Sequence, residues 1–200
     1  MDYEIIIQAF WLIIPAYVAN ASALLVGGGT PIDFGKTYKD GKRILGDGKT
    51  WRGLFAGAFL GMTSGFALSV LAKYAQLYSF PIHLSDFTGF PYMIPLIFSI
   101  CFGALLGDII ESFFKRRIGK ERGEDWIPFD QLDFIMGVLF TTLIVSLLLY
   151  YVGFLSYNWF SMNFTFAHIL TLLIATPFIH LFSNFIHKKM KRQGMVNKSI

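Results

Sequence analysis

The sequence predicts an all-α integral membrane protein that crosses the bilayer about five times. Hydrophobic residues make up 54% of its 200 residues and charged residues only 15%, which is far from the average of a soluble domain. The apolar residues gather in five segments, each close to the roughly 20 residues that a membrane-spanning helix needs. These segments are residues 5–26, 54–80, 92–114, 132–157 and 164–187. We therefore expect one membrane-embedded domain over residues 1–200.

The positions of the basic residues predict the orientation of the chain. Of the 17 Lys and Arg, six fall in residues 36–52, five in residues 115–122 and five after His187. All three places lie on the same side of a five-span chain, and the positive-inside rule makes that side cytoplasmic. We expect the N-terminus outside, the C-terminus inside, and two charged cytoplasmic loops, residues 27–53 and 115–131. This clustering explains the net charge of +4 without a nucleic-acid partner, and the basic tail is expected to contact anionic headgroups.

The first apolar segment resembles a cleaved signal peptide only at its end. Ala19, Asn20 and Ala21 imitate a cleavage site, but Asp2 and Glu4 stand where a signal peptide has basic residues. We expect a retained first helix. Asn20 lies near the inner end of that helix, where it could make a helix–helix hydrogen bond or contact a ligand beside the basic loop.

The first charged loop, residues 27–53, reads GGGTPIDFGKTYKDGKRILGDGKTWRG. Its glycines allow close backbone approach, and backbone amides in such turns can hold phosphate oxygens. Gly48, Lys49 and Thr50 imitate the end of a P-loop, but Arg43 stands where that motif needs glycine. A basic loop that only fixes orientation is the alternative. The length of this loop and its mixture of Gly, Thr and Asp favour phosphate binding.

The second and third apolar segments carry structural signals. Small residues recur at four-residue spacing in the second segment, a pattern that lets helices pack closely: Gly53, Gly57, Gly61 and Gly65. Cys101, the single cysteine, lies in an apolar run, so one chain cannot form a disulfide framework.

The stretch from Gly107 to Asp133, GDIIESFFKRRIGKERGEDWIPFDQLD, carries the chemistry. An acidic residue costs roughly 2.5 to 3.5 kcal/mol at the middle of a bilayer, so its presence in an apolar segment indicates a function. Asp108 and Glu111 are three residues apart and share a helix face, and Asp130 and Asp133 repeat this spacing. Basic residues separate the two acid pairs. Acids that can hold Mg2+ beside cations that can hold phosphate suggest phosphoryl or nucleotidyl transfer at a membrane face. The alternative is a set of structural ion pairs.

These motifs resemble a known family. GDIIESFFKRRIGK followed by IPFDQLD is similar to the signature of the CDP-diacylglycerol synthases. The segments ANASALLVGGGTPIDFG and GDGKTWRG extend the resemblance to the archaeal branch of that family, the CDP-archaeol synthases. One departure from the broader signature is that Phe129 and Asp130 stand where a His-Gly-Gly run is usual. The resemblance covers nearly the whole chain.

The resemblance implies a cytidylyltransferase in the cell membrane that faces the cytoplasm. Its substrates would be CTP and a geranylgeranyl ether lipid phosphate, its cofactor Mg2+, and its products the CDP-activated lipid and pyrophosphate. The implied metal ligands are Asp108, Asp130 and Asp133. The implied contacts to substrate phosphates are Lys115 and Arg116, with Lys36, Lys49, Thr50 and Arg52 from the first loop, and Glu111 supports the metal site.

The residue types alone, apart from the resemblance, are consistent with such a mechanism. A lipid phosphate is already a nucleophile at neutral pH, so catalysis reduces to positioning and charge stabilisation. Two other classes remain open, a small polytopic transporter and a CDP-alcohol phosphotransferase. Against the first, the acids cluster at one membrane face; against the second, its DG-x2-AR motif is missing from the sequence.

Overall fold

The protein is all-helical in the computed structural model, which describes residues 3–121, 124 and 126–192, with side chains as far as Ile179. These residues form six helices: α1 (Tyr3–Val26), α2 (Trp51–Leu77), α3 (Met93–Arg117), α4 (Phe129–Tyr151), α5 (Trp159–Asn163) and α6 (Phe166–Arg192). The predicted all-α membrane fold is confirmed. Arg122 and the basic side chains after His187, from which orientation and headgroup contacts were predicted, lie outside the described part.

Four of the helices, α1 to α4, are long and apolar enough to cross a membrane. In α6 the described apolar part, Phe166–Ile179, is shorter. Pro15 lies within α1 and Pro177 within α6. The described part of the chain thus contains four complete candidate spans and the beginning of a fifth apolar helix, where the sequence predicts five spans.

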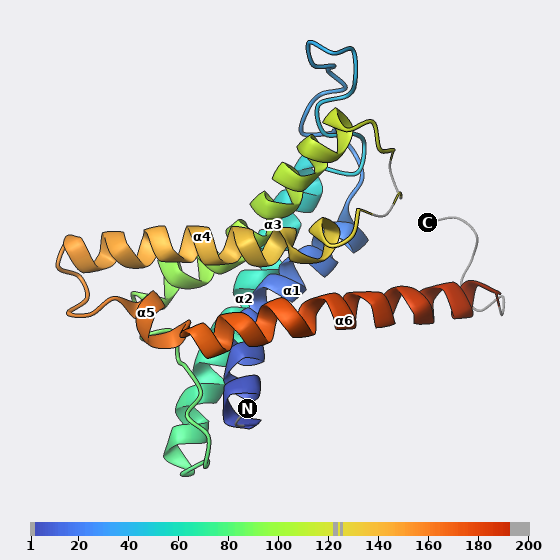
Figure 1. Ribbon diagram of the computed structural model, residues 1–200. Helices are drawn as coiled ribbons and strands as arrows, with labels where there is room; N and C mark the ends of the chain where they lie inside the picture. The colour runs from blue at the N-terminus through green and yellow to red at the C-terminus, as the bar shows by residue number, and fades with distance from the viewer. Residues whose placement is uncertain (1–2, 122–123, 125, 193–200) are drawn as a thin grey trace.

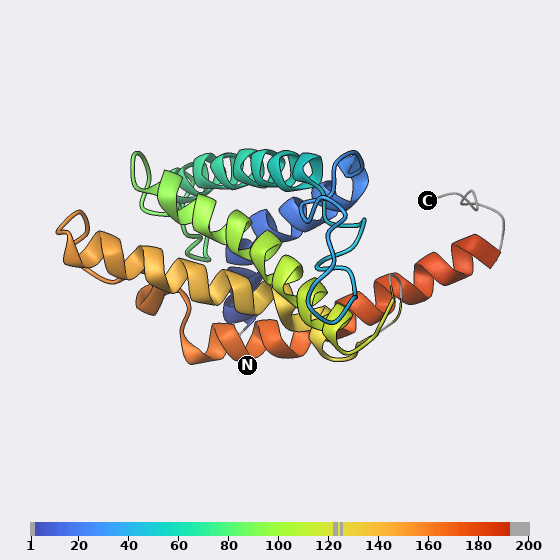
Figure 2. The ribbon, with the colours of Figure 1, turned by 90° about the horizontal axis from the view of Figure 1, so that it is seen from above.

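The helices cross one another in layers (Figures 1 and 2). α1 and α2 lie side by side, α3 packs against both, and α4 and α6 run in opposite directions across them. The core lies among α1, α3 and α4, where fully buried aliphatic side chains meet: Ile13, Ile97, Ile100, Ile135 and Val138. α6 covers α1 and α4 from the other side.

Glycines bring α2 against α1. A Cβ atom added to Gly57 would lie 2.7 Å from the backbone oxygen of Ala19, and one added to Gly61 would lie 2.9 Å from that of Pro15. Both distances are shorter than van der Waals contact, so only glycine permits this approach. The close packing predicted for the glycine stripe of the second segment is confirmed.

A second set of glycines, which sequence analysis did not single out, brings α3 against α4. A Cβ atom added to Gly103 would lie 2.7 Å from the backbone oxygen of Gly137, and one added to Gly107 would overlap the backbone oxygen of Asp133. Gly107 precedes Asp108 in the chain, so this contact places the acid-bearing turn of α3 beside that of α4.

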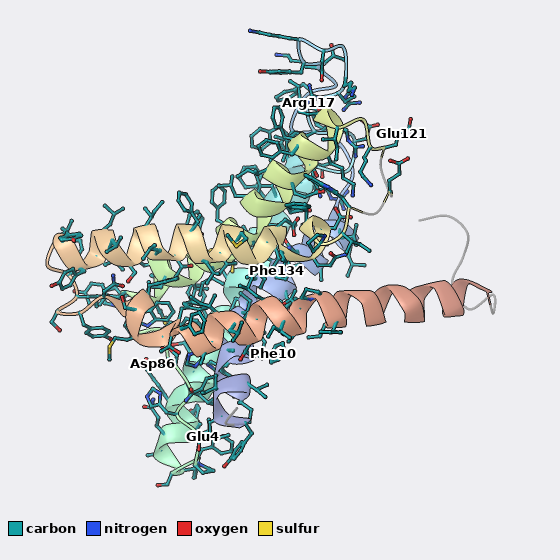
Figure 3. The ribbon with its side chains drawn as sticks, in the orientation of Figure 1. Glu4, Phe10, Asp86, Arg117, Glu121 and Phe134 are labelled. Carbon is teal, nitrogen blue, oxygen red and sulfur yellow. The ribbon has the colours of Figure 1, made fainter. Side chains whose placement is uncertain are left out.

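The charged loops gather at one end of the helices. Arg117, the last residue of α3, and Glu121, just after that helix, lie at this end, and Glu4 and Asp86 lie at the opposite end (Figure 3). The loop between α1 and α2 projects beyond the same turn of α3 (Figure 1). The two loops predicted to share a membrane side are therefore neighbours in space, while the cytoplasmic assignment of that side stays a prediction.

Candidate active site

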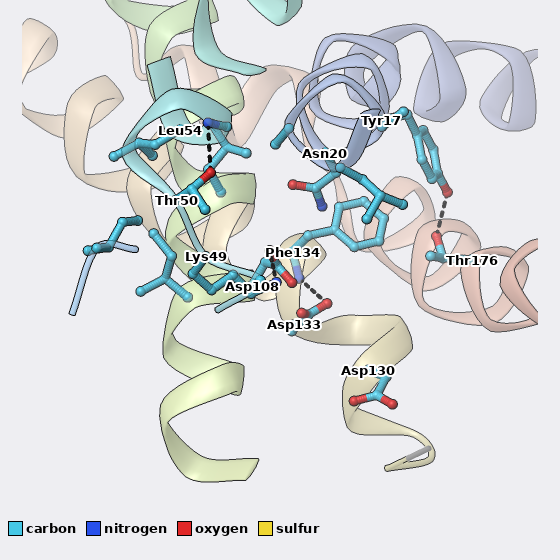
Figure 4. Close-up of a pocket in the computed structure, with 18 of the residues that line it drawn as sticks. Tyr17, Asn20, Lys49, Thr50, Leu54, Asp108, Asp130, Asp133, Phe134 and Thr176 are labelled. Atoms are coloured by element: carbon cyan, nitrogen blue, oxygen red, sulfur yellow. Dashed lines mark hydrogen bonds and ion pairs between the residues drawn. The ribbon is translucent and has the colours of Figure 1, made fainter. Parts of the chain in front are cut away.

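A cavity of about 420 Å³ lies between α1, α2, α3, α4 and α6 at the end that carries the charged loops (Figure 4). Apolar side chains such as Leu54, Leu105 and Phe134 form part of its wall. The polar side chains of the wall come from four helices and one loop: Tyr17, Asn20, Lys49, Thr50, Asp108, Asp130, Asp133 and Thr176. A cavity with convergent polar groups in a mostly apolar wall is the usual form of a small-molecule site.

Three carboxylates meet at the α3–α4 contact. Asp108, Glu111 and Asp133 each place one carboxylate oxygen within 4.8 Å of an oxygen of the other two. Such a set of hard oxygen donors suits Mg2+, which usually takes one or two carboxylates and keeps several water molecules. The donor set therefore fits the predicted cofactor. Asp108 and Asp133, two of the three metal ligands that the resemblance implies, belong to this set; its third carboxylate is Glu111, and Asp130 is not part of it.

Asp130 instead forms an ion pair. Lys115 Nζ lies 2.9 Å and 3.0 Å from the two carboxylate oxygens of Asp130, and the Trp126 N–H donates to Asp130 Oδ2 at 2.7 Å. Lys115 is buried and also lies 3.7 Å from Glu111 Oε1. Asp130 lines the cavity and Lys115 does not. Lys115 therefore contacts Asp130 and Glu111 from outside the cavity wall.

The first loop delivers Lys49 into the cavity. Lys49 Nζ donates to Asp108 Oδ2 at 2.6 Å, which joins the loop to the acid cluster. The backbone of the neighbouring residues is fixed by a bridge between Pro31 and Thr50, with the Ile32 N–H donating to the Lys49 oxygen at 2.8 Å. Thr50 Oγ1 accepts from the Gly53 N–H at 3.1 Å and caps α2, so its hydroxyl already has a structural use.

The fold of this loop is organised around Asp33, a residue that sequence analysis did not select. Its side chain is fully buried and accepts hydrogen bonds from Arg43 and from the backbone N–H groups of Gly35, Leu45 and Gly46 at 2.9 to 3.3 Å. Burial alone would raise the pKa of Asp33, but these hydrogen bonds outweigh it and hold the pKa well below its usual value. Asp33 stands two residues before Gly35, and this Asx-turn spacing is the sequence signal that could have found it.

Asp33→Asn is expected to destabilise the loop by about 2 to 3 kcal/mol at pH 7, because buried donors lose a charged acceptor. A carboxyl whose pKa is lowered by folding stabilises the protein above its unfolded pKa and loses that effect as the pH falls. The difference in melting temperature between wild type and variant should therefore shrink as the pH falls below about 4. Asp47→Asn is the control, since Asp47 also pairs with Arg43 at 2.8 Å but is 70% exposed. Equal effects of both substitutions would contradict the role of Asp33.

The other basic residues predicted to bind phosphate lie elsewhere. Arg116 donates to the backbone oxygens of Leu45 and Lys120 and so ties the first loop to the end of α3. Arg117 does the same through Asp40, at 2.6 Å. Lys36 and Arg52 are exposed and are not part of the cavity wall.

Asn20 faces the cavity from α1. Its Oδ1 is buried and accepts no hydrogen bond from the described residues, and Figure 4 shows its amide turned toward the space between α1 and the acids. A buried amide oxygen is normally satisfied, so this one points to a ligand donor. The described residues give this oxygen no helix–helix hydrogen bond, and contact between Asn20 and a ligand stays a prediction.

Known proteins are similar to this chain over most of its length. Residues 2–195 match a family model described as CarS-like, CDP-archaeol synthase. The chain belongs to the CDP-archaeol synthase family. CDP-archaeol synthase of Methanococcoides burtonii is 44% identical over 175 residues, which cover 86% of this chain and 93% of the relative. That of Archaeoglobus fulgidus is 43% identical over 185 residues, with 92% and 93% covered.

A solved structure is similar in fold as well. It is described as an intramembrane enzyme for archaeal membrane lipids biosynthesis, is 32% identical, and superposes with a TM-score of 0.67 over 90% of this chain and 94% of its own. CDP-archaeol synthases are nucleotidyltransferases, so the chain is a multi-pass membrane enzyme of lipid synthesis. The transporter and CDP-alcohol phosphotransferase alternatives lose their basis.

Proposed function

We propose that this enzyme transfers the cytidylyl group of CTP to 2,3-di-O-geranylgeranylglyceryl phosphate at the cytoplasmic face of the membrane, with Mg2+ as cofactor. An oxygen of the lipid phosphate bonds to the α-phosphorus of CTP. The bond from that phosphorus to the oxygen bridging it to the β-phosphorus breaks, and pyrophosphate leaves with the electron pair. The product is the CDP-activated ether lipid.

The observation that carries the proposal is the 2.6 Å contact between Lys49 and Asp108 inside one cavity. It places a cation from the glycine-rich loop beside the acid cluster of α3 and α4. A triphosphate needs both kinds of group at once, because cations neutralise its oxygens and acids hold the metal that it brings. Neither helix packing nor membrane orientation requires this pairing.

The residues of the cavity divide the chemistry among them. Asp108, Glu111 and Asp133 would hold Mg2+, which when bound offsets the negative charge of the reacting phosphates. Lys49 is placed to move from Asp108 to a phosphate oxygen of CTP. Asn20 offers a free amide oxygen to a donor of the nucleotide.

The acceptor needs no activating base. A phosphate monoester already carries nucleophilic oxygens at neutral pH, so no Ser, Cys or His has to lose a proton. The protein has to align the lipid phosphate with the α-phosphate of CTP. It also has to keep water out of the cavity between them.

Pyrophosphate release by the detergent-purified enzyme tests the proposal. We expect release with CTP, and little with ATP, GTP or UTP, and only when both Mg2+ and the geranylgeranyl ether lipid phosphate are present. An ester lipid phosphate with matched chain length tests the preference for ether lipids. Folded protein that releases no pyrophosphate from any of the four triphosphates would overturn the proposal.

A further inference from the structure

We propose that an apolar groove between α3 and α4 binds a hydrocarbon chain of the lipid phosphate acceptor, an inference that rests on the proposed function. The groove has a volume of about 560 Å³ and shares Asp133 with the wall of the polar cavity. Its lining contains two acids, Glu111 and Asp133, and the side chain of Trp126. The rest of the lining consists of glycines and apolar side chains of α3 and α4: Gly107, Ile110, Phe114, Phe129, Leu132, Met136, Gly137 and Phe140.

The groove opens on the outer surface of the helices. Phe114, Met136 and Phe140 line it and are 52%, 57% and 65% exposed, as expected for side chains that face a bilayer. Figure 1 shows the last turns of α3 diverging from α4 along this stretch. From Phe129 to Phe140, α4 rises about 16 Å, long enough to hold much of a prenyl chain. A lipid could enter from the side without leaving an apolar environment.

The groove also reaches the acid cluster. Asp133 lines both the groove and the polar cavity, and Glu111 lines the groove. Both acids belong to the candidate metal site. A lipid whose chain occupies the groove therefore has its polar end beside the carboxylates that face the nucleotide cavity. This continuity separates the groove from ordinary lipid-facing surface.

A second observation indicates that the ligand has a polar end. Glu111 Oε1 is buried and accepts no hydrogen bond from the described residues, with Lys115 Nζ 3.7 Å away. The ion pair with Lys115 balances the charge of Glu111, but at 3.7 Å it is too long for a hydrogen bond, so the oxygen can take a further partner. A hydrocarbon chain alone offers no such partner, whereas the candidate metal site, to which Glu111 belongs, lies at this end of the groove.

Filling the groove should weaken the use of the lipid selectively. For Met136→Trp we expect the KM for the lipid phosphate to rise about tenfold, as when roughly two buried methylene groups lose their contacts. The KM for CTP should stay within about twofold of wild type, because the nucleotide cavity is unchanged. Ile144→Trp is the matched control, since Ile144 is on the same helix, 41% exposed, and lines neither space.

The outcomes separate this inference from the proposed function. Wild-type enzyme that consumes no CTP would refute the function itself. Active wild type with an unchanged lipid KM in Met136→Trp would refute the groove alone. A short-chain, water-soluble lipid phosphate should lose less in the variant than the geranylgeranyl lipid does, because Met136 lies one helical turn from Asp133 and a short chain fills little of the groove beyond it.

Photolabelling of the wild-type enzyme gives a test that needs no variant. An acceptor lipid with a photoreactive group at its chain end should label peptides of α3 and α4 that line the groove. Equal labelling by a phospholipid of the same chain length, without a phosphate monoester, would show that bulk lipid fills the groove and would overturn the proposal. Cross-linking of α4 to a second copy of the chain would overturn it in favour of a dimer contact.

Discussion

Replacing Asp108 by asparagine is expected to slow CTP-dependent pyrophosphate release by at least roughly a thousandfold, because the acid cluster would lose one of the charges proposed to hold Mg2+. Asparagine has nearly the shape of aspartate, and Asp108 has one described partner, Lys49. The fold should therefore survive, which circular dichroism and the melting temperature check. Binding of Mn2+, followed by its electron paramagnetic resonance signal, should weaken in parallel with activity.

Asp86→Asn is the control for this substitution, because Asp86 lies at the opposite end of the molecule (Figure 3). It should leave both turnover and Mn2+ binding near wild type. A folded Asp108→Asn enzyme with near-normal turnover would remove Asp108 from the metal site.

The same assay decides the role of Asp130. The sequence and the family resemblance predict a metal ligand, whereas the structure gives both of its oxygens to Lys115. If Asp130 acts through Lys115, Asp130→Asn should lower turnover by about ten- to a hundredfold, with Mn2+ affinity nearly unchanged. A loss of Mn2+ binding as large as that of Asp108→Asn would restore Asp130 to the metal site.

The sequence predicted the fold class because membrane helices follow from length and hydropathy alone. The family resemblance implied that Asp108, Asp130 and Asp133 hold the metal, and the structure brings Asp108 and Asp133 together. The partner of these two acids could not be read from spacing. The third position depends on how α3 and α4 cross at Gly107, and that crossing puts Glu111 in the cluster and turns Asp130 toward Lys115.

The loop residues show a second limit of sequence reasoning. Basic residues of a glycine-rich loop all resemble phosphate ligands when only their type is known. In the structure Lys49 enters the cavity, whereas Lys36 and Arg52 of the same loop are exposed and lie outside the cavity wall. The shape of the loop depends on hydrogen bonds that donors up to 13 residues away make to Asp33, and the Asx-turn spacing alone does not predict this burial.

Lys49→Ala is expected to have two opposite effects, weaker use of CTP and tighter binding of a divalent cation in the absence of CTP. Lys49 Nζ lies 2.6 Å from Asp108 Oδ2, so in the free enzyme its charge neutralises an acid of the metal cluster. A metal ion at the cluster must compete with that ammonium group or displace it. Removing the ammonium group should therefore make metal binding tighter. It also removes a cation that CTP would contact, so CTP binding should become weaker.

The sizes of the two effects follow from exposure. Two unit charges about 4 Å apart interact by about 4 kcal/mol near a protein surface. The side chains of Lys49 and Asp108 are 24% and 32% exposed, so Lys49 can swing away from an incoming ion and most of this energy is relieved. We expect Mn2+ affinity to rise about three- to tenfold and the KM for CTP to rise about ten- to a hundredfold.

Two further variants separate this account from simple damage to the loop. Lys49→Arg keeps the charge and should keep Mn2+ affinity near wild type, while Lys36→Ala removes an exposed charge of the same loop and should change neither quantity. Lys49→Ala protein with unchanged Mn2+ affinity and unchanged CTP dependence would show that the Lys49–Asp108 contact is a structural ion pair. A rise in Mn2+ affinity together with a loss of CTP affinity is hard to obtain from a disordered loop, since disorder would weaken both. The paired measurement therefore tests whether Lys49 is shared between the acid cluster and the triphosphate.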